Sequence, residues 1–255
     1  MQHIDSCGTL RNFKLTISYD GRQFHGWQIQ NNAMTVQEAF QNALTKIIGE
    51  DFDIKGCSRT DSGVHANMYC ISLKTSHPIA PVRLKAALNR WLPLSIAVLD
   101  CEQVPDDFHA RYSCTSKEYI YKIWNTDVRN PFLDGYALHY RYKLDEEILN
   151  KAAQAYVGTH DFTSFCTLDS REKGDMTRTV KAFSVTREGN LVTMKVEADG
   201  FLYNMVRIMV GTLLRIQQGK IPVDGIAGII EKKDRKFAGP TAQPCGLYLN
   251  RVNYD

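Results

Sequence analysis

The chain has 255 residues, of which 44% are hydrophobic and 23% charged, a composition typical of a folded globular protein. No apolar run approaches the roughly 20 residues that cross a bilayer, and residues 1–12 fit neither a signal peptide nor a transit sequence, which predicts a cytoplasmic protein with a flexible N-terminal tail. A net charge of +3 allows a polyanionic partner but does not by itself indicate one.

The first half of the chain begins with a strand and a capped helix. Residues 13–20 alternate between apolar and polar side chains, which is typical of a half-buried strand. Thr35 and Glu38 form a capping box before apolar residues at helical spacing, and Gly49 ends that helix. The remaining elements are expected in the order strand 52–54, polar loop 58–66, strand 69–73, a helix opening at Pro81 and strand 96–104.

The second half repeats the same order after a joint near residues 106–113. Its expected elements are a strand at 117–125, a helix at 144–157, a hairpin of strands 179–187 and 191–199, helices at 201–218 and 224–231, and a strand at 246–253. Two longer loops, 126–141 and 166–177, either carry function or are disordered.

Both halves therefore follow the β-α-β-β-α-β order of ferredoxin-like units. We predict an α+β fold in which two fused ferredoxin-like βαββαβ halves form a largely antiparallel sheet, with helices packed on it and a cleft between the halves. The corresponding domains are the flexible tail at residues 1–12, an N-terminal subdomain at 13–108 and a C-terminal subdomain at 109–255.

Seven scattered cysteines give no sign of a disulfide framework or a metal site. Their odd number, without a secretory signal, predicts reduced thiols. No Cys-x-x-Cys motif occurs in the sequence, and no histidine falls at a zinc-finger spacing. We expect the cysteines to act as small apolar side chains.

The loop at residues 59–66, which reads Arg-Thr-Asp-Ser-Gly-Val-His-Ala, is the densest polar cluster in the sequence. Its composition alone favours a hairpin connection, since Asp-Ser-Gly is good turn chemistry and Asp61 could accept backbone N–H groups. The loop is nevertheless longer than a minimal hairpin requires, and Arg59 could keep Asp61 ionised as a nucleophile. Both interpretations remain open at this point.

The octapeptide resembles the catalytic loop of the TruA family of pseudouridine synthases, which usually reads Arg-Thr-Asp-Ala-Gly-Val-His after a glycine. Ser58 and Ser62 stand where the family usually has Gly and Ala, and Asn204 and Ile208 replace the commoner His and Asn. Further segments resemble the family in its order along nearly the whole chain: Tyr19-Asp20-Gly21, Gly26-Trp27-Gln28, residues 104–111, Tyr119-Ile120-Tyr121, residues 161–165, residues 201–207 and Gly246-Leu247-Tyr248-Leu249.

This resemblance implies a tRNA pseudouridine synthase that isomerises uridine at positions thirty-eight to forty of the tRNA anticodon stem-loop. It also implies an RNA-binding cleft between the halves, base flipping, a homodimer, and no metal or organic cofactor. A uridine stacked in an RNA stem cannot present its ribose or C6 to a carboxylate, so the base must flip out at a cost of a few kcal/mol.

The same resemblance assigns Asp61 as the catalytic nucleophile, and Tyr119, Arg207 and Arg59 as substrate-binding residues. Arg111 is added to the substrate-binding residues because it lies at the joint between the halves, where it could contact a phosphate. Tyr119 would stack on the uracil, and its hydroxyl could remove the C5 proton. Arg207 would pair with Asp61, while Arg59 and Arg111 would contact RNA. Without the resemblance, Tyr119 would be interpreted as a strand aromatic, and Arg207 could equally reach solvent from a helix edge.

Two other classes of protein fit the same element order. Ferredoxin-like units include RNA-recognition folds that only bind, although the Lys/Arg-Gly-Phe/Tyr-x-Phe signature of those folds is missing from the sequence. Small-molecule enzymes also use this order, but no P-loop or Gly-x-Gly-x-x-Gly motif supports one.

Overall fold

The computed structural model describes residues 9–167 and 174–254, and these fall into two compact units. The first unit is Met1–Thr115 with Val252–Asp255, and the second is Ser116–Arg251. The predicted subdomain boundary lies after Phe108, a few residues before this division. Arg11 and Asn12, which we assigned to the flexible tail, lie in the first strand, and the tail residues 1–8 lie outside the described residues.

In the first strand of the first unit, buried and partly exposed side chains alternate from Phe13 to Tyr19, as the sequence predicts. The elements of this unit are β1 (Arg11–Tyr19), α1 (Val36–Ile48), β2 (Phe52–Gly56), β3 (His65–Thr75), α2 (Pro81–Trp91) and β4 (Ile96–Val104). The described strands pair antiparallel in the order β4-β1-β3-β2. The predicted β-α-β-β-α-β order therefore occurs in this unit.

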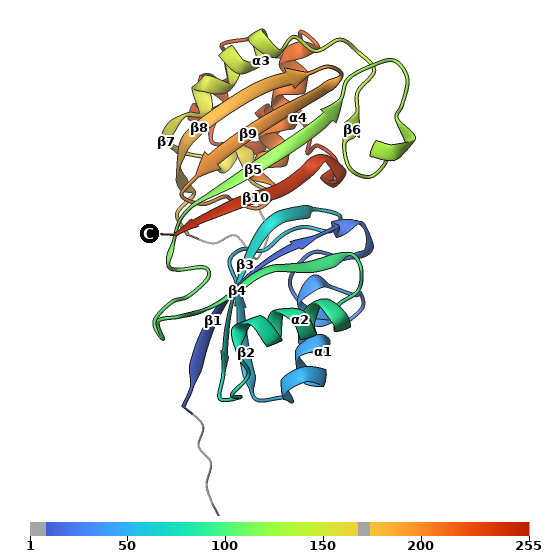
Figure 1. Cartoon of the computed structure of the whole chain (residues 1–255). Coiled ribbons are helices and arrows are strands. Elements are labelled where there is room, and N and C mark those ends of the chain that lie inside the picture. Colours follow the sequence, from blue (N-terminus) through green and yellow to red (C-terminus); the bar gives the residue numbers. More distant parts are fainter. Residues whose placement is uncertain (1–8, 168–173, 255) are drawn as a thin grey trace, which may run out of the picture. The chain divides into compact units, whose positions relative to one another are not determined.

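Helices α1 and α2 contact each other and cover one face of this sheet (Figure 1). The Thr35 side chain accepts a hydrogen bond from the Glu38 backbone N–H, which confirms the predicted cap of α1. Gly49 ends the helix with a φ of 79°, a conformation that glycine adopts without steric penalty. Fully buried residues of β1 and the two helices fill the space between the layers: Phe13, Leu15, Ile17, Phe40, Leu44, Leu84 and Leu88.

The second unit is also a sheet with helices packed on it. Helix α3 (Glu146–Ala153) contacts α4 (Met205–Gln217) and the strand Thr177–Glu188, and α4 is drawn behind the strands in Figure 1. The longer elements of this unit are β5 (Cys114–Trp124), α3 (Glu146–Ala153), β8 (Thr177–Glu188), β9 (Leu191–Ala198), α4 (Met205–Gln217), α5 (Gly225–Lys232) and β10 (Leu247–Tyr254). Two short strands complete it, β6 (Leu138–His139) and β7 (Gly158–Asp161). Hydrogen bonds join them in the order β10-β5-β9-β8-β7, with β6 parallel to β5.

Several predicted elements of the second unit have different bounds or neighbours. The helix predicted at 144–157 is α3 followed by a 3-10 turn, Gln154–Tyr156, and α4 begins at Met205 rather than at 201. The loop predicted at 126–141 contains the 3-10 turn Pro131–Leu133 and β6. Of the loop predicted at 166–177, residues 168–173 lie outside the described residues.

The strands of the described chain thus pair mostly antiparallel, and the fold is of the mixed α+β class. In the ranges 9–167 and 174–254, no helix is both long and apolar enough to cross a membrane. The six cysteines in these ranges are free thiols: Cys57, Cys70, Cys101, Cys114, Cys166 and Cys245.

Candidate catalytic loop and substrate-binding residues

The polar loop between β2 and β3 places Asp61 at the start of a β-turn. The backbone N–H of Val64 donates to the Asp61 carbonyl over 3.1 Å, and Gly63 has a φ of 76°. A positive φ at the third position of a turn is readily adopted only by glycine. The loop carries both Asp61 and Arg59, and the two residues differ in their exposure to solvent: Asp61 is half-buried, whereas Arg59 is exposed.

The segment that joins β1 to α1 holds this loop through the backbone on both sides of Asp61. Trp27 N–H donates to the Thr60 carbonyl over 3.3 Å, and Gly63 N–H donates to the Phe24 carbonyl over 3.3 Å. Gly26 has a φ of 82°, and a Cβ atom there would lie 2.2 Å from the Thr60 carbonyl oxygen. Only glycine therefore allows the chain to pass this close to the residue before Asp61.

Aromatic side chains support the loop on the side that precedes Asp61. The hydroxyls of Tyr19 and Thr60 share a hydrogen bond of 2.9 Å, and the Tyr69 hydroxyl donates to the Ser58 carbonyl. The Trp27 and Tyr69 rings stack with centroids 4.3 Å apart. These contacts order a loop that contains no secondary structure of its own.

His65 has a structural position at the other end of the loop. It is 1% exposed, and its Nδ1 accepts a hydrogen bond of 3.1 Å from Gly21 N–H. An Asp20 carboxylate oxygen lies 3.3 Å from the same nitrogen, which cannot donate while it accepts, so the backbone contact defines its role. Asp20 instead pairs with Arg22 through both carboxylate oxygens.

The two tyrosines of β5 have different surroundings. Tyr119 is 6% exposed and meets Phe201 edge to face, with ring centroids 5.0 Å apart. Tyr121 is fully buried, and its hydroxyl donates to the Gln243 carbonyl over 2.7 Å. Burial raises the pKa of Tyr121 far above its usual value, so its phenol remains protonated.

Arg207 is half-buried and lies in α4 as predicted, in the first turn, because the helix begins at Met205. Its Nε donates to the Ala242 carbonyl over 2.7 Å, and its Nη1 donates to the Asn204 side-chain oxygen over 2.8 Å. Asn204 itself has a left-handed φ of 62°. A cation at a helix N-terminus opposes the helix dipole, so Arg207 does not stabilise α4 through its charge. These contacts fix the direction of the guanidinium.

Arg111 lies in the connection between β4 and β5 and is exposed. Its backbone N–H donates to His109 Nδ1 over 3.0 Å, and its guanidinium carbon lies 5.7 Å from the centre of the Tyr112 ring. Arg59, Asp61 and Arg111 thus belong to the first unit and Tyr119 and Arg207 to the second, and the predicted pairing of Asp61 with Arg207 stays a prediction.

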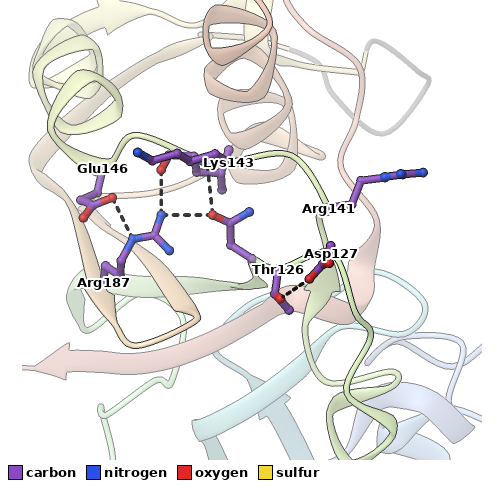
Figure 2. Close-up of a pocket in the computed structure, with 8 residues that line it drawn as sticks. Thr126, Asp127, Arg141, Lys143, Glu146 and Arg187 are labelled. Atoms are coloured by element: carbon purple, nitrogen blue, oxygen red, sulfur yellow. Dashed lines mark hydrogen bonds and ion pairs between the residues drawn. The ribbon is translucent and has the colours of Figure 1, made fainter.

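Sequence reasoning missed a polar cavity of about 480 Å³ in the second unit (Figure 2). Arg187 donates to Glu146 over 2.8 Å, to the Asn125 side-chain oxygen over 3.1 Å and to the Leu144 carbonyl over 2.8 Å. Hydrogen bonding to Arg187 lowers the pKa of Glu146. Asn125 also donates to two backbone carbonyls of residues 140 and 142, so this network serves to fix the segment at residues 140–144.

The local sequence carries little signal for this network, because its members come from three separate segments: Asn125, residues 140–146 and Arg187. An Asn at a strand end and an Arg in a hairpin are individually ordinary. Across the residues that the structure describes, no group of three or more His, Cys, Asp or Glu side chains is arranged to hold a metal ion.

Comparison with known proteins identifies the family. The family model described as tRNA pseudouridine synthase matches residues 15–113 and 152–255. The chain is 44% identical over 245 residues to proteins named tRNA pseudouridine synthase A from Thermoanaerobacter sp. (strain X514) and Acetivibrio thermocellus. It is 39% identical over 246 residues to tRNA pseudouridine synthase A 2 from Bacillus anthracis. Each alignment covers 96% of this chain and the whole of the relative, and the chain therefore belongs to the tRNA pseudouridine synthase family, in its TruA branch.

Proposed function

We propose that this protein isomerises uridine to pseudouridine in tRNA and that Asp61 is the nucleophile. The observation that carries the assignment of Asp61 is its position on a turn held on both sides by backbone hydrogen bonds from the segment after β1. A nucleophile must be kept close to its attack geometry, and such a turn orders the backbone before substrate binds.

The reaction breaks the C1′–N1 bond of uridine, turns the uracil and joins the sugar to C5. The target base is flipped out of the RNA so that the carboxylate reaches it. Asp61 then attacks C1′ or C6, and the aspartyl bond is broken again when the product forms. The proton lost from C5 leaves in the last step, so its release reports a complete turnover.

The other site residues act on binding and proton transfer. Tyr119 stacks on the flipped uracil, and its hydroxyl removes the C5 proton. Arg207 pairs with Asp61 and aims its carboxylate at the substrate. Two features of Arg207 support this role. A cation at the start of a helix does not stabilise the helix dipole, and the hydrogen bonds to Ala242 and Asn204 orient the guanidinium. Arg59 and Arg111 contact the RNA backbone beside the target.

We propose further that the two units are ferredoxin-like halves that bind the anticodon arm of tRNA in a cleft. The targets are uridines at positions thirty-eight to forty. The protein acts in the cytoplasm as a homodimer. Sedimentation of the purified protein tests the dimer, and a monomer at micromolar concentration would contradict it.

The function is tested with tRNA carrying tritium at C5 of uridine. The wild-type protein should release tritium in many turnovers, and its tRNA affinity should fall steeply as salt rises, because bound phosphates release counterions. Tight binding without release would favour the RNA-binding module instead. Affinity that does not change with salt would count against a tRNA substrate.

A further inference from the structure

The connection between β4 and β5 is an ordered loop that carries an unexplained exposed aromatic ring. Ser113 N–H donates to the His109 carbonyl over 2.9 Å, and His109 N–H donates to the Ser113 hydroxyl over 3.0 Å. Asn12 donates from its side chain to the carbonyls of Pro105 and Phe108, each over 2.9 Å. The backbone of the loop is therefore fixed at several points by its own unit.

The end of the chain adds a second anchor to this loop. The Phe108 ring lies 5.1 Å from the Tyr254 ring, and the Tyr254 hydroxyl donates to the Ala110 carbonyl over 2.7 Å. Ala110 is fully buried, although the next two residues are exposed. The exposed residues 111 and 112 are thus carried by a loop whose buried part is fixed.

Tyr112 is the large aromatic residue of this loop that faces solvent, with 77% of its surface exposed. The His109 ring lies against it, with centroids 4.4 Å apart and ring planes inclined by 34°. His109 Nδ1 accepts the backbone N–H groups of Arg111 and Tyr112, which fixes the imidazole. Burial and nearby Lys55 lower the pKa of His109, so the ring is neutral at physiological pH.

We propose that Tyr112, supported by His109, is a stacking platform for one unpaired base of the bound tRNA, with Arg111 placed for a phosphate next to that base. Proteins that bind single-stranded RNA use this combination of an aromatic ring and an adjacent arginine, because each base offers a π-face and each nucleotide a phosphate. The orientation of the ring is set before binding, so little side-chain freedom is lost when a base stacks on it.

This inference rests on the proposed tRNA substrate but does not depend on Asp61. It separates substrate positioning from chemistry, since the platform holds a base other than the one that reacts. Removal of the ring should therefore weaken tRNA binding and leave the rate at saturating tRNA nearly unchanged.

The test compares tRNA affinity for Tyr112→Ala, Tyr112→Phe and Trp91→Ala in the full-length protein. Trp91 is a matched control, because it is also an exposed aromatic ring, 51% exposed, with a cation, Lys46, 5.0 Å from the ring centre. It lies at the end of α2 and not in the loop that carries Tyr112. We expect about tenfold weaker binding for Tyr112→Ala and affinity within twofold of wild type for the other two variants. The melting temperature should stay the same in all three.

A series of tRNAs, each with one abasic nucleotide, then locates the stacked base. One abasic position should weaken wild-type binding by a similar factor and have no further effect on Tyr112→Ala. If wild type binds tRNA but no position shows this coupling, the platform is wrong and the proposed function stands. A Tyr112→Ala protein that changes its oligomeric mass instead would assign the ring to a protein interface. Absence of wild-type tRNA binding would overturn both proposals.

Discussion

Tyr119 and Tyr121 are two residues apart on β5, yet their side chains have different surroundings. The hydroxyl of Tyr121 is used by the Gln243 carbonyl inside the protein, and burial keeps it protonated. Tyr119 retains slight exposure and has the edge of Phe201 against its ring. The alternating pattern of the strand does not separate the two tyrosines, and only the family resemblance singled out Tyr119. The structure adds the difference in their surroundings.

We predict that Tyr119→Phe lowers tritium release by about 10²–10⁴-fold, the range typical of general-base assistance, while tRNA affinity barely changes. The ring remains and can still stack, but the C5 proton has no acceptor. The measurement is single-turnover tritium release together with a binding curve.

Tyr121→Phe is the control for that experiment. It removes one buried hydrogen bond and should lower the free energy of unfolding by about 1 kcal/mol, while activity changes little. If both substitutions reduce release by the same few-fold factor, the tyrosines are structural and the proton leaves through another group.

At the scale of elements, the loop that carries Asp61 is shaped by the connection between β1 and α1. The sequence predicted the strand, the cap at Thr35 and the polar loop, because alternation and capping are local patterns. It did not predict that Gly26 approaches the Thr60 carbonyl, because that contact joins segments far apart in the chain. From the sequence, Gly26 and Trp27 were noted only for their resemblance to the family. The structure gives a physical reason why glycine is needed at position 26.

We predict that Gly26→Ala lowers both stability and activity. The added Cβ would lie 2.2 Å from the Thr60 carbonyl oxygen, and the left-handed φ would be strained, so the backbone next to Asp61 must shift. We expect a loss of more than about 1 kcal/mol in unfolding free energy and a large loss of tritium release, measured by denaturant titration and activity assay.

Gly228→Ala provides the comparison. Gly228 lies in α5, and a Cβ there would meet no atom within 4 Å. Alanine should raise the unfolding free energy by up to about 1 kcal/mol through helix propensity, with activity unchanged. A Gly26→Ala protein that is as stable and as active as Gly228→Ala would show that the close approach does not position the loop.

At the scale of the whole molecule, periodicity predicted the element order well and the irregular parts poorly. The β-α-β-β-α-β order of the first unit follows from strand alternation and two amphipathic helices. The short strands β6 and β7 carry too few residues for a periodic signal. The segment after β6 is held by the side-chain network around Asn125 and Arg187, which no local pattern encodes.

The site residues stay predictions that come mainly from resemblance, and the structure adds the local contacts of some of them. The fixed turn explains why Asp61 can be held in one geometry, and the contacts of Arg207 explain its orientation. The net charge of +3 carried little information about the partner. RNA binding depends more on a few arginines positioned to contact phosphates than on the total charge of the protein.

The most direct test of the central claim is tritium release and pseudouridine content measured together for wild type, Asp61→Ala and the control Asp100→Ala on one tRNA. Asp100 is an exposed carboxylate on β4 of the same unit. Wild type and Asp100→Ala should form one pseudouridine for each tritium released. Asp61→Ala should form none above background and should bind tRNA within a few-fold of wild type, because phosphate contacts supply most of the affinity. Pseudouridine formed by Asp61→Ala above background would contradict the assignment of the nucleophile.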